Sequence, residues 1–162
     1  MSVTLTPIGV IRTPHRRLEG MPIQPAGARG VRGTIELRDE FAPGLKDLDG
    51  FSHVILIYHL HRAAEPSLRL VPFMDTEERG VFATRAPRRP NPIGLSVVRL
   101  VGIEGSVLTI EDVDMLDGTP LLDIKPYVSE FDGGAPRDLR VGWLEKFRGK
   151  VRGHRSDERF RE

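Results

Sequence analysis

Arginines within one proline-rich segment are the residues of this chain whose type and spacing most directly suggest chemistry. Residues 79–99 read RGVFATRAPRRPNPIGLSVVR and carry Arg85, Arg88 and Arg89, while no acidic residue occurs over residues 79–103. Guanidinium groups form paired, charge-assisted hydrogen bonds with phosphates and carboxylates. The segment therefore predicts a site that recognises an anion. The alternatives are a solvated basic loop and arginines that pair with acids distant in the sequence.

Prolines are expected to make this segment stiff. Proline fixes its own φ and keeps the preceding residue out of the helical region, so we expect Ala86, Arg89 and Asn91 to be extended. The run Val81–Thr84 before the prolines is strand-like, and the β-branched run Ile93–Val98 after them is typical of a second strand. The sequence thus predicts a rigid loop between two strands.

Three histidines beside another strand-like run suggest a metal site at first sight. His53, His59 and His61 share one parity along the chain. His53 and His59 are six residues apart, which corresponds to about 20 Å along an extended strand. One ion cannot bind both, so we expect no metal site here and interpret these residues as core or cofactor-contacting histidines.

The composition is that of one soluble domain. With 162 residues and an apolar fraction of 39%, the chain is long enough to bury a real core. No stretch resembles a membrane span or a signal peptide, and the absence of cysteine excludes disulfides, thiolate metal sites and cysteine nucleophiles. We therefore expect a cytoplasmic protein.

Charge is segregated along the chain although its sum is small. The formal net charge of +1 does not by itself indicate a nucleic-acid partner. Residues 1–33 contain five arginines against the single acid Glu19, whereas acidic residues gather in 39–49 and 104–123. This segregation favours a two-sided electrostatic surface, which is one feature of polyanion-binding proteins.

Short strands separated by Gly- and Pro-rich turns favour an all-β fold, mainly an antiparallel β-barrel with one or two short helices. The clearest element is a hairpin of Ile93–Ile103 and Ser106–Val113, joined at a Glu-Gly turn. The continuous apolar run Phe51–Leu60 predicts a central strand that is buried on both faces. Other expected elements are strands at Val3–Arg12 and Val31–Leu37, a helical turn at Pro43–Leu48 and a long loop at His15–Arg29.

The C-terminal part is expected to be distinct from the barrel. We assign residues 1–136 to the barrel domain and 137–162 to a C-terminal helix and mobile tail. Leu139, Trp143 and Phe147 repeat every four residues and would share one helix face. The last dozen residues are charged with few apolar positions, which predicts a frayed or partner-dependent tail.

Two strings of the sequence resemble a known family. VFATRAPRRPNPIGLS at 81–96 and DGTPLLDIKPY at 117–127 resemble the TrmO/TsaA family of S-adenosylmethionine-dependent tRNA methyltransferases, over about Ile8 to Val128. The resemblance implies a β-barrel instead of a Rossmann sheet, and methylation of the N6 of threonylcarbamoyladenosine beside the anticodon of tRNA. It also implies a homodimer with the methyl donor near the subunit interface. Two departures are Ala86, where the family often has Ser, and the lack of the extra C-terminal domain of some bacterial relatives.

The resemblance also implies where the donor binds. Small residues after Gln24 would let the backbone approach the donor closely. The resemblance implies further donor contacts in three places: directly after the apolar run at 51–60, within the arginine segment at 79–99, and at Glu111–Asp114. The implied donor-binding residues are Pro25, Ala26, Gly27, His61, Arg62, Arg85, Leu95, Glu111, Asp112, Val113 and Asp114.

Methylation of an exocyclic adenine nitrogen releases a proton, so a base or a hydrogen-bond acceptor is expected beside the target. Asp117 is the leading candidate, with Asp114 and Asp123 as alternatives. The other catalytic candidates are Lys125, Tyr127 and Asn91, whose amide is expected either to bind an adenine edge or to cap its loop.

Arginines are the expected contacts to tRNA. One guanidinium of the arginine segment would pair with the threonyl carboxylate of the modified base, and phosphate contacts would make binding salt-dependent. Two other functions stay open: a methyltransferase of the same fold that acts on a small molecule or another RNA, and a non-catalytic RNA-binding module. The predicted substrate-binding residues are Arg12, Arg16, Arg17, Arg88 and Arg89.

Overall fold

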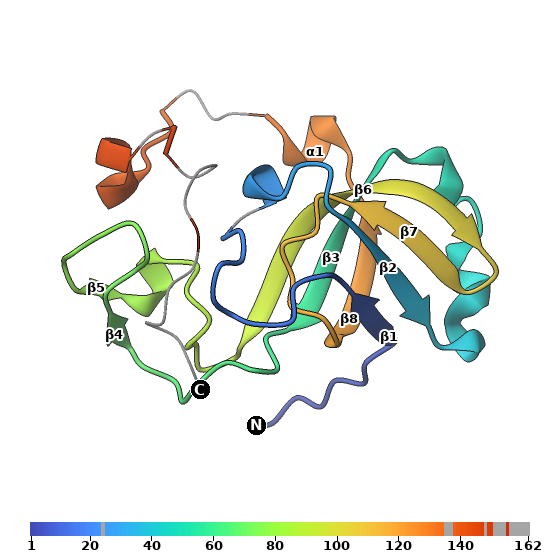
Figure 1. The fold of residues 1–162 in the computed structure, drawn as a ribbon, viewed down its shortest axis with the longest axis horizontal. Coiled ribbons are helices and arrows are strands. Elements are labelled where there is room, and N and C mark those ends of the chain that lie inside the picture. Colours follow the sequence, from blue (N-terminus) through green and yellow to red (C-terminus); the bar gives the residue numbers. More distant parts are fainter. Residues whose placement is uncertain (24, 135–137, 148, 151–154, 156–162) are drawn as a thin grey trace.

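Six strands close into a barrel in the computed structural model of this protein (Figure 1). Around the barrel the order is β1-β2-β7-β6-β3-β8, and every neighbouring pair is antiparallel. The structure describes all residues except 24, 135–137, 148, 151–154 and 156–162. The barrel strands are β1 (Gly9–Arg12), β2 (Arg32–Leu37), β3 (His53–His59), β6 (Ile93–Glu104), β7 (Val107–Glu111) and β8 (Thr119–Pro126).

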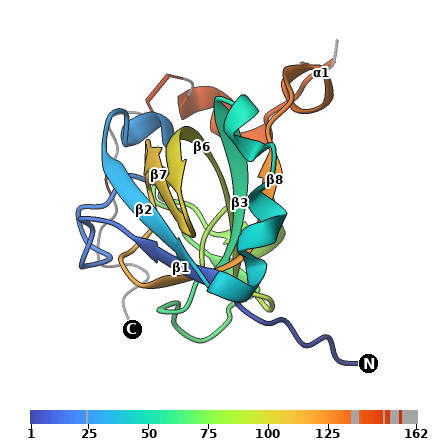
Figure 2. The ribbon, with the colours of Figure 1, turned by 90° about the vertical axis from the view of Figure 1, so that its right-hand side faces the viewer.

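Alternate residues of each strand fill the barrel interior, which Figure 2 shows encircled by the strands. In β3, Val54, Leu56 and Tyr58 are buried, whereas Ile55 and Ile57 on the outer face are half-buried. This period of two is that of a sheet with one buried face. The predicted all-β barrel is confirmed, but the expectation that Phe51–Leu60 is buried on both faces is wrong, because a closed barrel has no second layer over its outside.

The predicted hairpin forms as β6 and β7. Gly105 lies in its turn with φ of 62°, a left-handed conformation that glycine adopts without steric cost. The strand predicted at Val31–Leu37 is β2 almost residue for residue. The strand predicted at Val3–Arg12 forms only from Gly9 onward, and the residues before it are mostly exposed.

A smaller group of elements lies beside the barrel, at the left of Figure 1. It contains the two-stranded sheet of β4 (Arg69–Leu70) and β5 (Arg79–Gly80), followed by the 3₁₀ turn η4 (Val81–Ala83). We call residues 69–86 the side lobe. Its own apolar cluster consists of Leu70, Val81, Ala86 and the partly buried Phe73.

The strand predicted at Val81–Thr84 is wrong, because η4 occupies this position. Both the backbone N–H and the hydroxyl of Thr84 donate to the carbonyl of Val81, at 3.1 and 2.8 Å. A threonine side chain that bonds back to its own turn competes with the sheet ladder, and β-propensity does not report this competition.

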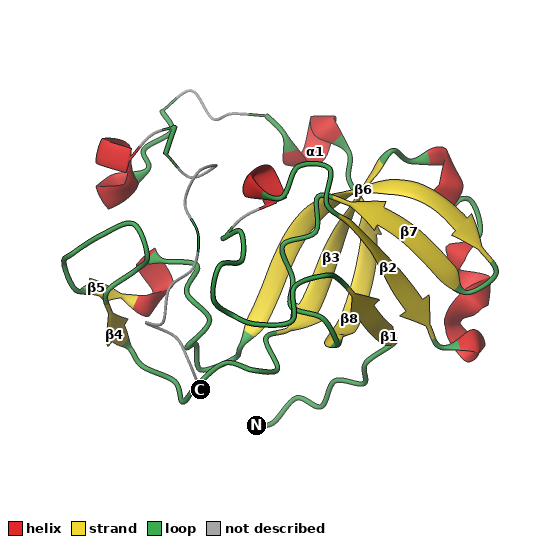
Figure 3. Cartoon of the chain, viewed as in Figure 1, coloured by secondary structure: helices red, strands yellow, loops and turns green. Residues whose placement is uncertain are grey.

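All helices are short and lie outside the barrel wall (Figure 3). Two 3₁₀ turns replace the single helical turn predicted at Pro43–Leu48. The predicted C-terminal helix is a 3₁₀ segment that excludes Leu139, and most of the predicted tail lies outside the described residues. The remaining elements are η1 (Pro25–Gly27), η2 (Asp39–Leu45), η3 (Leu48–Gly50), α1 (Ser129–Asp132) and η5 (Gly142–Phe147).

Candidate active site

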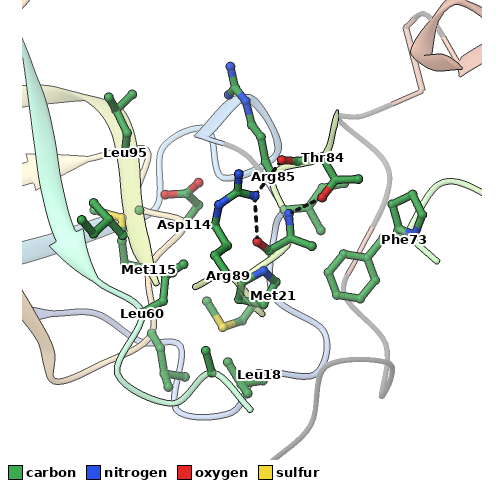
Figure 4. A pocket seen from close by; sticks show the side chains of 18 of the residues that line it. Leu18, Met21, Leu60, Phe73, Thr84, Arg85, Arg89, Leu95, Asp114 and Met115 are labelled. Carbon is green, nitrogen blue, oxygen red and sulfur yellow. Dashed lines mark hydrogen bonds between the residues drawn. The ribbon is translucent and has the colours of Figure 1, made fainter. Parts of the chain in front are cut away.

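A cavity of about 880 Å³ lies between the barrel and the side lobe, and we call it the main cavity. Its volume is within the range of sites for small molecules and cofactors. Several segments distant in sequence form its walls (Figure 4). The walls include Tyr58, Leu60, Leu95 and Met115 from the barrel side, Phe73 and Phe82 from the side lobe, Leu18 and Met21 from the N-terminal loop, and Trp143 and Leu144 from the C-terminal segment.

Asp114 presents a carboxylate to this largely apolar cavity (Figure 4). Burial raises the pKa of Asp114 to about 6, while a hydrogen bond from the Ser96 hydroxyl at 2.8 Å and the positive charge of Arg85 oppose the rise without cancelling it. A carboxylate with such a pKa exchanges its proton close to neutral pH. That property is typical of residues that act as general acids or bases.

A buried chain of hydroxyl groups runs from Asp114 into the barrel. The Tyr58 hydroxyl lies 2.7 Å from the Ser96 hydroxyl, and Ser96 is only 1% exposed. Burial, together with the negative charge of Asp114, raises the pKa of the Tyr58 phenol well above its ordinary value. Tyr58 therefore keeps its proton throughout the physiological pH range.

Gly94 makes room for this chain. It faces Tyr58 across the β3–β6 pairing, and a Cβ atom at position 94 would lie only 2.1 Å from the Tyr58 ring. The glycine of the Pro-Asn-Pro-Ile-Gly string is thus required because an aromatic ring packs directly on its backbone.

Arg89 braces the loop that carries it. Its Nη1 donates to the carbonyl oxygens of Val81 at 3.1 Å, Thr84 at 2.8 Å and Ala86 at 3.3 Å. Two of these hydrogen bonds are drawn in Figure 4. The stiffness of the predicted loop therefore comes from an arginine that satisfies backbone carbonyls as well as from the prolines.

The other two arginines of the segment lie in different environments. Arg88 donates through Nε to the Glu65 carbonyl at 2.7 Å, while Arg85 lines the main cavity, close enough to Asp114 to act on its pKa. Of the three, Arg85 is positioned best to meet an anionic group of a ligand in the main cavity.

The other predicted donor-binding residues divide into three groups, of which the third is Glu111–Val113. His61, Arg62 and Leu95 line the main cavity. Pro25, Ala26 and Gly27 form η1, which lies against β6, and neither Ala26 nor Gly27 lines the main cavity. The donor role of η1 stays a prediction.

Glu111, Asp112 and Val113 make contacts within the barrel. The Glu111 carboxylate accepts a hydrogen bond from Arg32 Nε at 2.9 Å, and that of Asp112 accepts one from the Gly30 N–H at 2.7 Å. Val113 is fully buried in the core. These side chains stabilise the end of β7 and the start of β2, and their predicted contact with the donor stays a prediction.

Asp117 lies in a second, open cavity of about 690 Å³, which we call the basic groove. Arg12, Arg16 and Arg32 also line this groove. The Asp117 carboxylate accepts a hydrogen bond from the Thr13 N–H at 3.1 Å. Two carboxylates predicted as base candidates, Asp117 and Asp114, therefore face different cavities.

Several other candidates line neither cavity. Lys125 pairs with Asp123 at 2.9 Å, and the Tyr127 ring meets His53 edge-on with 6.4 Å between ring centroids. Their catalytic roles stay predictions. Within the described part of the chain, the candidates outside both cavities also include Asn91, Arg17 and Arg88.

Tyr58 and Ser96 are site residues that the motifs did not reveal. Tyr58 shares parity with Val54 and Leu56 in β3, and Ser96 shares parity with Val98 in β6. A tyrosine and a serine at inward positions need hydrogen-bond partners in the core. The alternation of inward and outward residues could have identified Tyr58 and Ser96 from the sequence. No pattern in the sequence indicates that Trp143 packs against the main cavity.

The described residues form neither a metal-binding cluster nor a membrane-spanning helix. No group of three or more His, Cys, Asp or Glu side chains is arranged to hold a metal ion in that part of the chain. No helix among the described residues is both long enough and apolar enough to cross a membrane.

Comparisons with known proteins agree with the geometry. A probable S-adenosyl-L-methionine-binding protein of Pyrococcus abyssi is 54% identical over 160 residues, covering 99% of this chain and 86% of the relative. A mouse tRNA (adenine(37)-N6)-methyltransferase is 34% identical over 142 residues, covering 83% of this chain and 32% of the mouse protein. The crystal structure of TrmO from Pseudomonas aeruginosa superimposes with a TM-score of 0.72 at 43% identity.

These relatives differ in length from this chain. The superposition on Pseudomonas aeruginosa TrmO covers 88% of this chain but only 63% of the crystallised one, so the chain spans less than two thirds of that protein. The family model for the tRNA-methyltransferase O N-terminal domain matches residues 10–133, which contain all of the barrel except Gly9, together with the side lobe and the Asp114 carboxylate. The chain therefore belongs to the tRNA-methyltransferase O N-terminal domain family, whose members are S-adenosylmethionine-dependent methyltransferases.

Proposed function

We propose that this protein transfers a methyl group from S-adenosylmethionine to the N6 of threonylcarbamoyladenosine beside the anticodon of tRNA. The main cavity, which combines an ionisable Asp114 and the Arg85 guanidinium with apolar and aromatic walls, carries this proposal. The match to the family model and the similarity to the mouse tRNA (adenine(37)-N6)-methyltransferase support the N6 of a tRNA adenine as the target.

The lining of the main cavity fits the chemical groups of the donor. S-adenosylmethionine contains a flat adenine, a sulfonium cation and a carboxylate. Phe73, Phe82 and Trp143 offer aromatic surfaces for the adenine, and aromatic faces also attract a sulfonium. The Asp114 carboxylate complements the positive sulfur, and Arg85 complements the donor carboxylate. When bound, the donor supplies an activated methyl group, so the protein chiefly has to align the target nitrogen with it.

The basic groove is the proposed contact with the tRNA backbone. Arg12 and Arg16 line it, and Arg17 follows directly in the sequence. Arg12 also pairs with Glu36 at 3.4 Å, but both side chains are about half-exposed, so a phosphate in water can compete for this guanidinium. An anticodon-loop base is already unpaired, so moving it from the loop into the main cavity costs little free energy.

The outer face of β3 and β6 supports a homodimer. Ile55 pairs with Val97 and Ile57 with Leu95 across these strands, and Leu95 is 57% exposed. An exposed apolar stripe on a sheet is typical of a protein–protein contact. Because Leu95 also lines the main cavity, a second copy bound to this face would lie at the edge of the proposed donor site.

Arg85→Ala is the variant that tests the site. Loss of the guanidinium should weaken the binding of S-adenosylmethionine by about 10-fold or more, since charge-assisted hydrogen bonds contribute about 1.5–3 kcal/mol. Isothermal titration calorimetry measures this affinity, with Arg69→Ala as the control, because Arg69 pairs with Glu78 on the exposed surface of the side lobe. Wild-type affinity in Arg85→Ala would remove Arg85 from the donor site.

Mass spectrometry of tRNA nucleosides tests the acceptor. Cells that lack this gene should lose methylated threonylcarbamoyladenosine and regain it when the wild-type gene is restored. An unchanged level together with donor binding in vitro would favour a small molecule or another RNA as acceptor. No donor binding at all would favour a non-catalytic RNA-binding module.

A further inference from the structure

The hydroxyl chain behind Asp114 leads to an inference that rests on the proposed function and deepens it. We propose that Asp114 accepts the proton released by the target nitrogen, and that Ser96 and Tyr58 are positioning residues that hold its carboxylate for this step. In the reaction a nitrogen–carbon bond forms, and the methyl–sulfur bond breaks with its electron pair left on sulfur. The N–H proton passes to the Asp114 carboxylate, from which water removes it.

The direction of the hydrogen bonds follows from the donors that are present. Ser96 has one hydroxyl proton and donates it to Asp114 Oδ1 at 2.8 Å. The Ser96 oxygen must therefore accept from Tyr58, whose hydroxyl lies 2.7 Å away and keeps its proton because its pKa is raised. The chain thus runs from Tyr58 through Ser96 to the ionised carboxylate. It fixes one oxygen of Asp114 and leaves the carboxylate in the acceptor state that a base requires.

The surroundings of Asp114 make it the carboxylate of the main cavity. β3 contributes Tyr58, β6 contributes Ser96, and the loop after η4 contributes Arg85. Leu18 and Met21 of the N-terminal loop and Trp143 and Leu144 of η5 bring no charge to it. The other ionisable lining residues in the described part of the chain are His61, Arg62 and Arg89.

Asp117 is less suited to this role. It opens into the basic groove, and its Oδ1 accepts a hydrogen bond from the Thr13 backbone. In addition, the Asp117 N–H donates to the His15 carbonyl at 2.7 Å, so residue 117 ties the N-terminal loop to the loop before β8. These contacts describe a residue that holds two loops together and faces the basic groove.

A proton acceptor of this kind predicts a distinct pH profile. The Asp114 carboxylate must be ionised, so kcat/KM should rise about tenfold per pH unit below about pH 6 and level off above it, because the pKa of Asp114 is about 6. The Ser96 hydrogen bond lowers the pKa of Asp114, so its removal in Ser96→Ala should move the acid limb to higher pH. Tyr58→Phe keeps the ring on Gly94 but removes the hydroxyl, and should give a smaller shift in the same direction.

The experiment measures methyl transfer from S-adenosylmethionine to tRNA that carries threonylcarbamoyladenosine, between pH 5 and pH 9. It uses the full-length wild type, Asp114→Asn, Ser96→Ala, Tyr58→Phe and Asp117→Asn, with His61→Gln to test the other base in the cavity. Calorimetry measures the donor affinity of each variant separately, and circular dichroism checks its fold. The expected result for Asp114→Asn is a rate at saturating donor that is lower by about 10²–10⁴-fold.

Three outcomes separate this inference from the proposed function. If the wild type methylates this tRNA and Asp114→Asn weakens donor binding but keeps the saturated rate, Asp114 is a donor contact and the inference fails. If Ser96→Ala lowers activity without moving the acid limb, Ser96 has only a structural role and the positioning claim fails. A wild type that binds the donor but does not methylate the tRNA overturns the proposed substrate itself, and this inference with it.

Discussion

At the scale of single residues, the three arginines at positions 85, 88 and 89 have different surroundings. The Arg89 Nη1 donates to three backbone carbonyls, the Arg88 Nε donates to another, and Arg85 lines the main cavity. The sequence identified the loop and its charge, but three arginines within five residues look equivalent until their partners are known. Which guanidinium meets a ligand depends on tertiary contacts that no local pattern contains.

Gly94→Ala is a residue-scale prediction. The new Cβ would lie 2.1 Å from the Tyr58 ring, so the ring or the strand must move. Overpacking of this kind destabilises a protein by about 1–3 kcal/mol. Urea unfolding should show this loss, and activity should fall as well, because the displaced ring carries the hydroxyl that bonds Ser96.

Gly102→Ala is the matched control, since Gly102 lies in the same strand with nothing within 4 Å of its added Cβ and without a positive φ. The control should leave the unfolding free energy within about 0.5 kcal/mol of the wild type. Equal destabilisation by the two alanines would show that the loss does not come from the contact with the Tyr58 ring.

At the scale of elements, most strands of the barrel could be predicted, whereas β8 and the parts around the barrel were not. β2, β6 and β7 combine alternation with a glycine turn, and both signals are local. The side lobe and η5 lack periodic patterns, because their small clusters and short turns are stabilised by contacts distant in sequence. About a third of the residues that line the main cavity come from these two parts, and among them a motif located Arg85 but not Trp143.

Asp75 connects the side lobe to η5. It is 3% exposed, and its carboxylate accepts hydrogen bonds from Arg79 Nε at 2.8 Å and from Lys146 Nζ of η5 at 3.4 Å. Burial favours the neutral acid, but the hydrogen bonds of Arg79 and of the following backbone N–H groups outweigh it and lower the pKa of Asp75 to about 2. Trp143 of η5 in turn donates to the Ala83 carbonyl at 2.8 Å, so this cluster holds one wall of the main cavity.

Asp75→Asn should loosen η5 from the side lobe while the barrel stays folded. Trp143 is the single tryptophan of the chain, so its fluorescence should shift to longer wavelength as the indole becomes hydrated, and donor affinity should fall. In the wild type, a lowered pKa means that this contribution to stability is present above about pH 4 and is lost as pH falls toward 2. Fluorescence should therefore stay constant through pH 6, where the activity limb of Asp114 appears.

Glu77→Gln is the control, because Glu77 also pairs with Arg79, at 2.9 Å, but is 65% exposed. Exposed ion pairs contribute little, so its fluorescence should match that of the wild type. A wild-type spectrum in Asp75→Asn would mean that η5 stays in place without this carboxylate.

At the scale of the whole molecule, arginines from the N-terminal part of the sequence meet acids from residues 104–123, such as Asp117, in one groove. Arg12, Arg16 and Arg32 converge on the basic groove, although Arg32 pairs with Glu111. The groove and the main cavity are distinct, which suits a polymeric substrate that binds through its backbone at one place and reacts at another. The net charge of +1 does not reveal this groove, because it sums all charged groups regardless of their position.

The apolar outer face of β3 and β6 carries the last prediction, which concerns assembly. Leu95→Glu places a charge in the centre of the stripe formed with Ile55, Ile57 and Val97, and burying an unpaired carboxylate in an interface is strongly unfavourable. Sedimentation equilibrium should find a dimer for the wild type and a monomer for Leu95→Glu. Val107→Glu on β7 is the control, because Val107 is exposed to a comparable extent, 40%, but lies outside this stripe, and it should stay dimeric. A monomeric wild type would contradict the homodimer, and dissociation of both variants would place the contact elsewhere on the barrel.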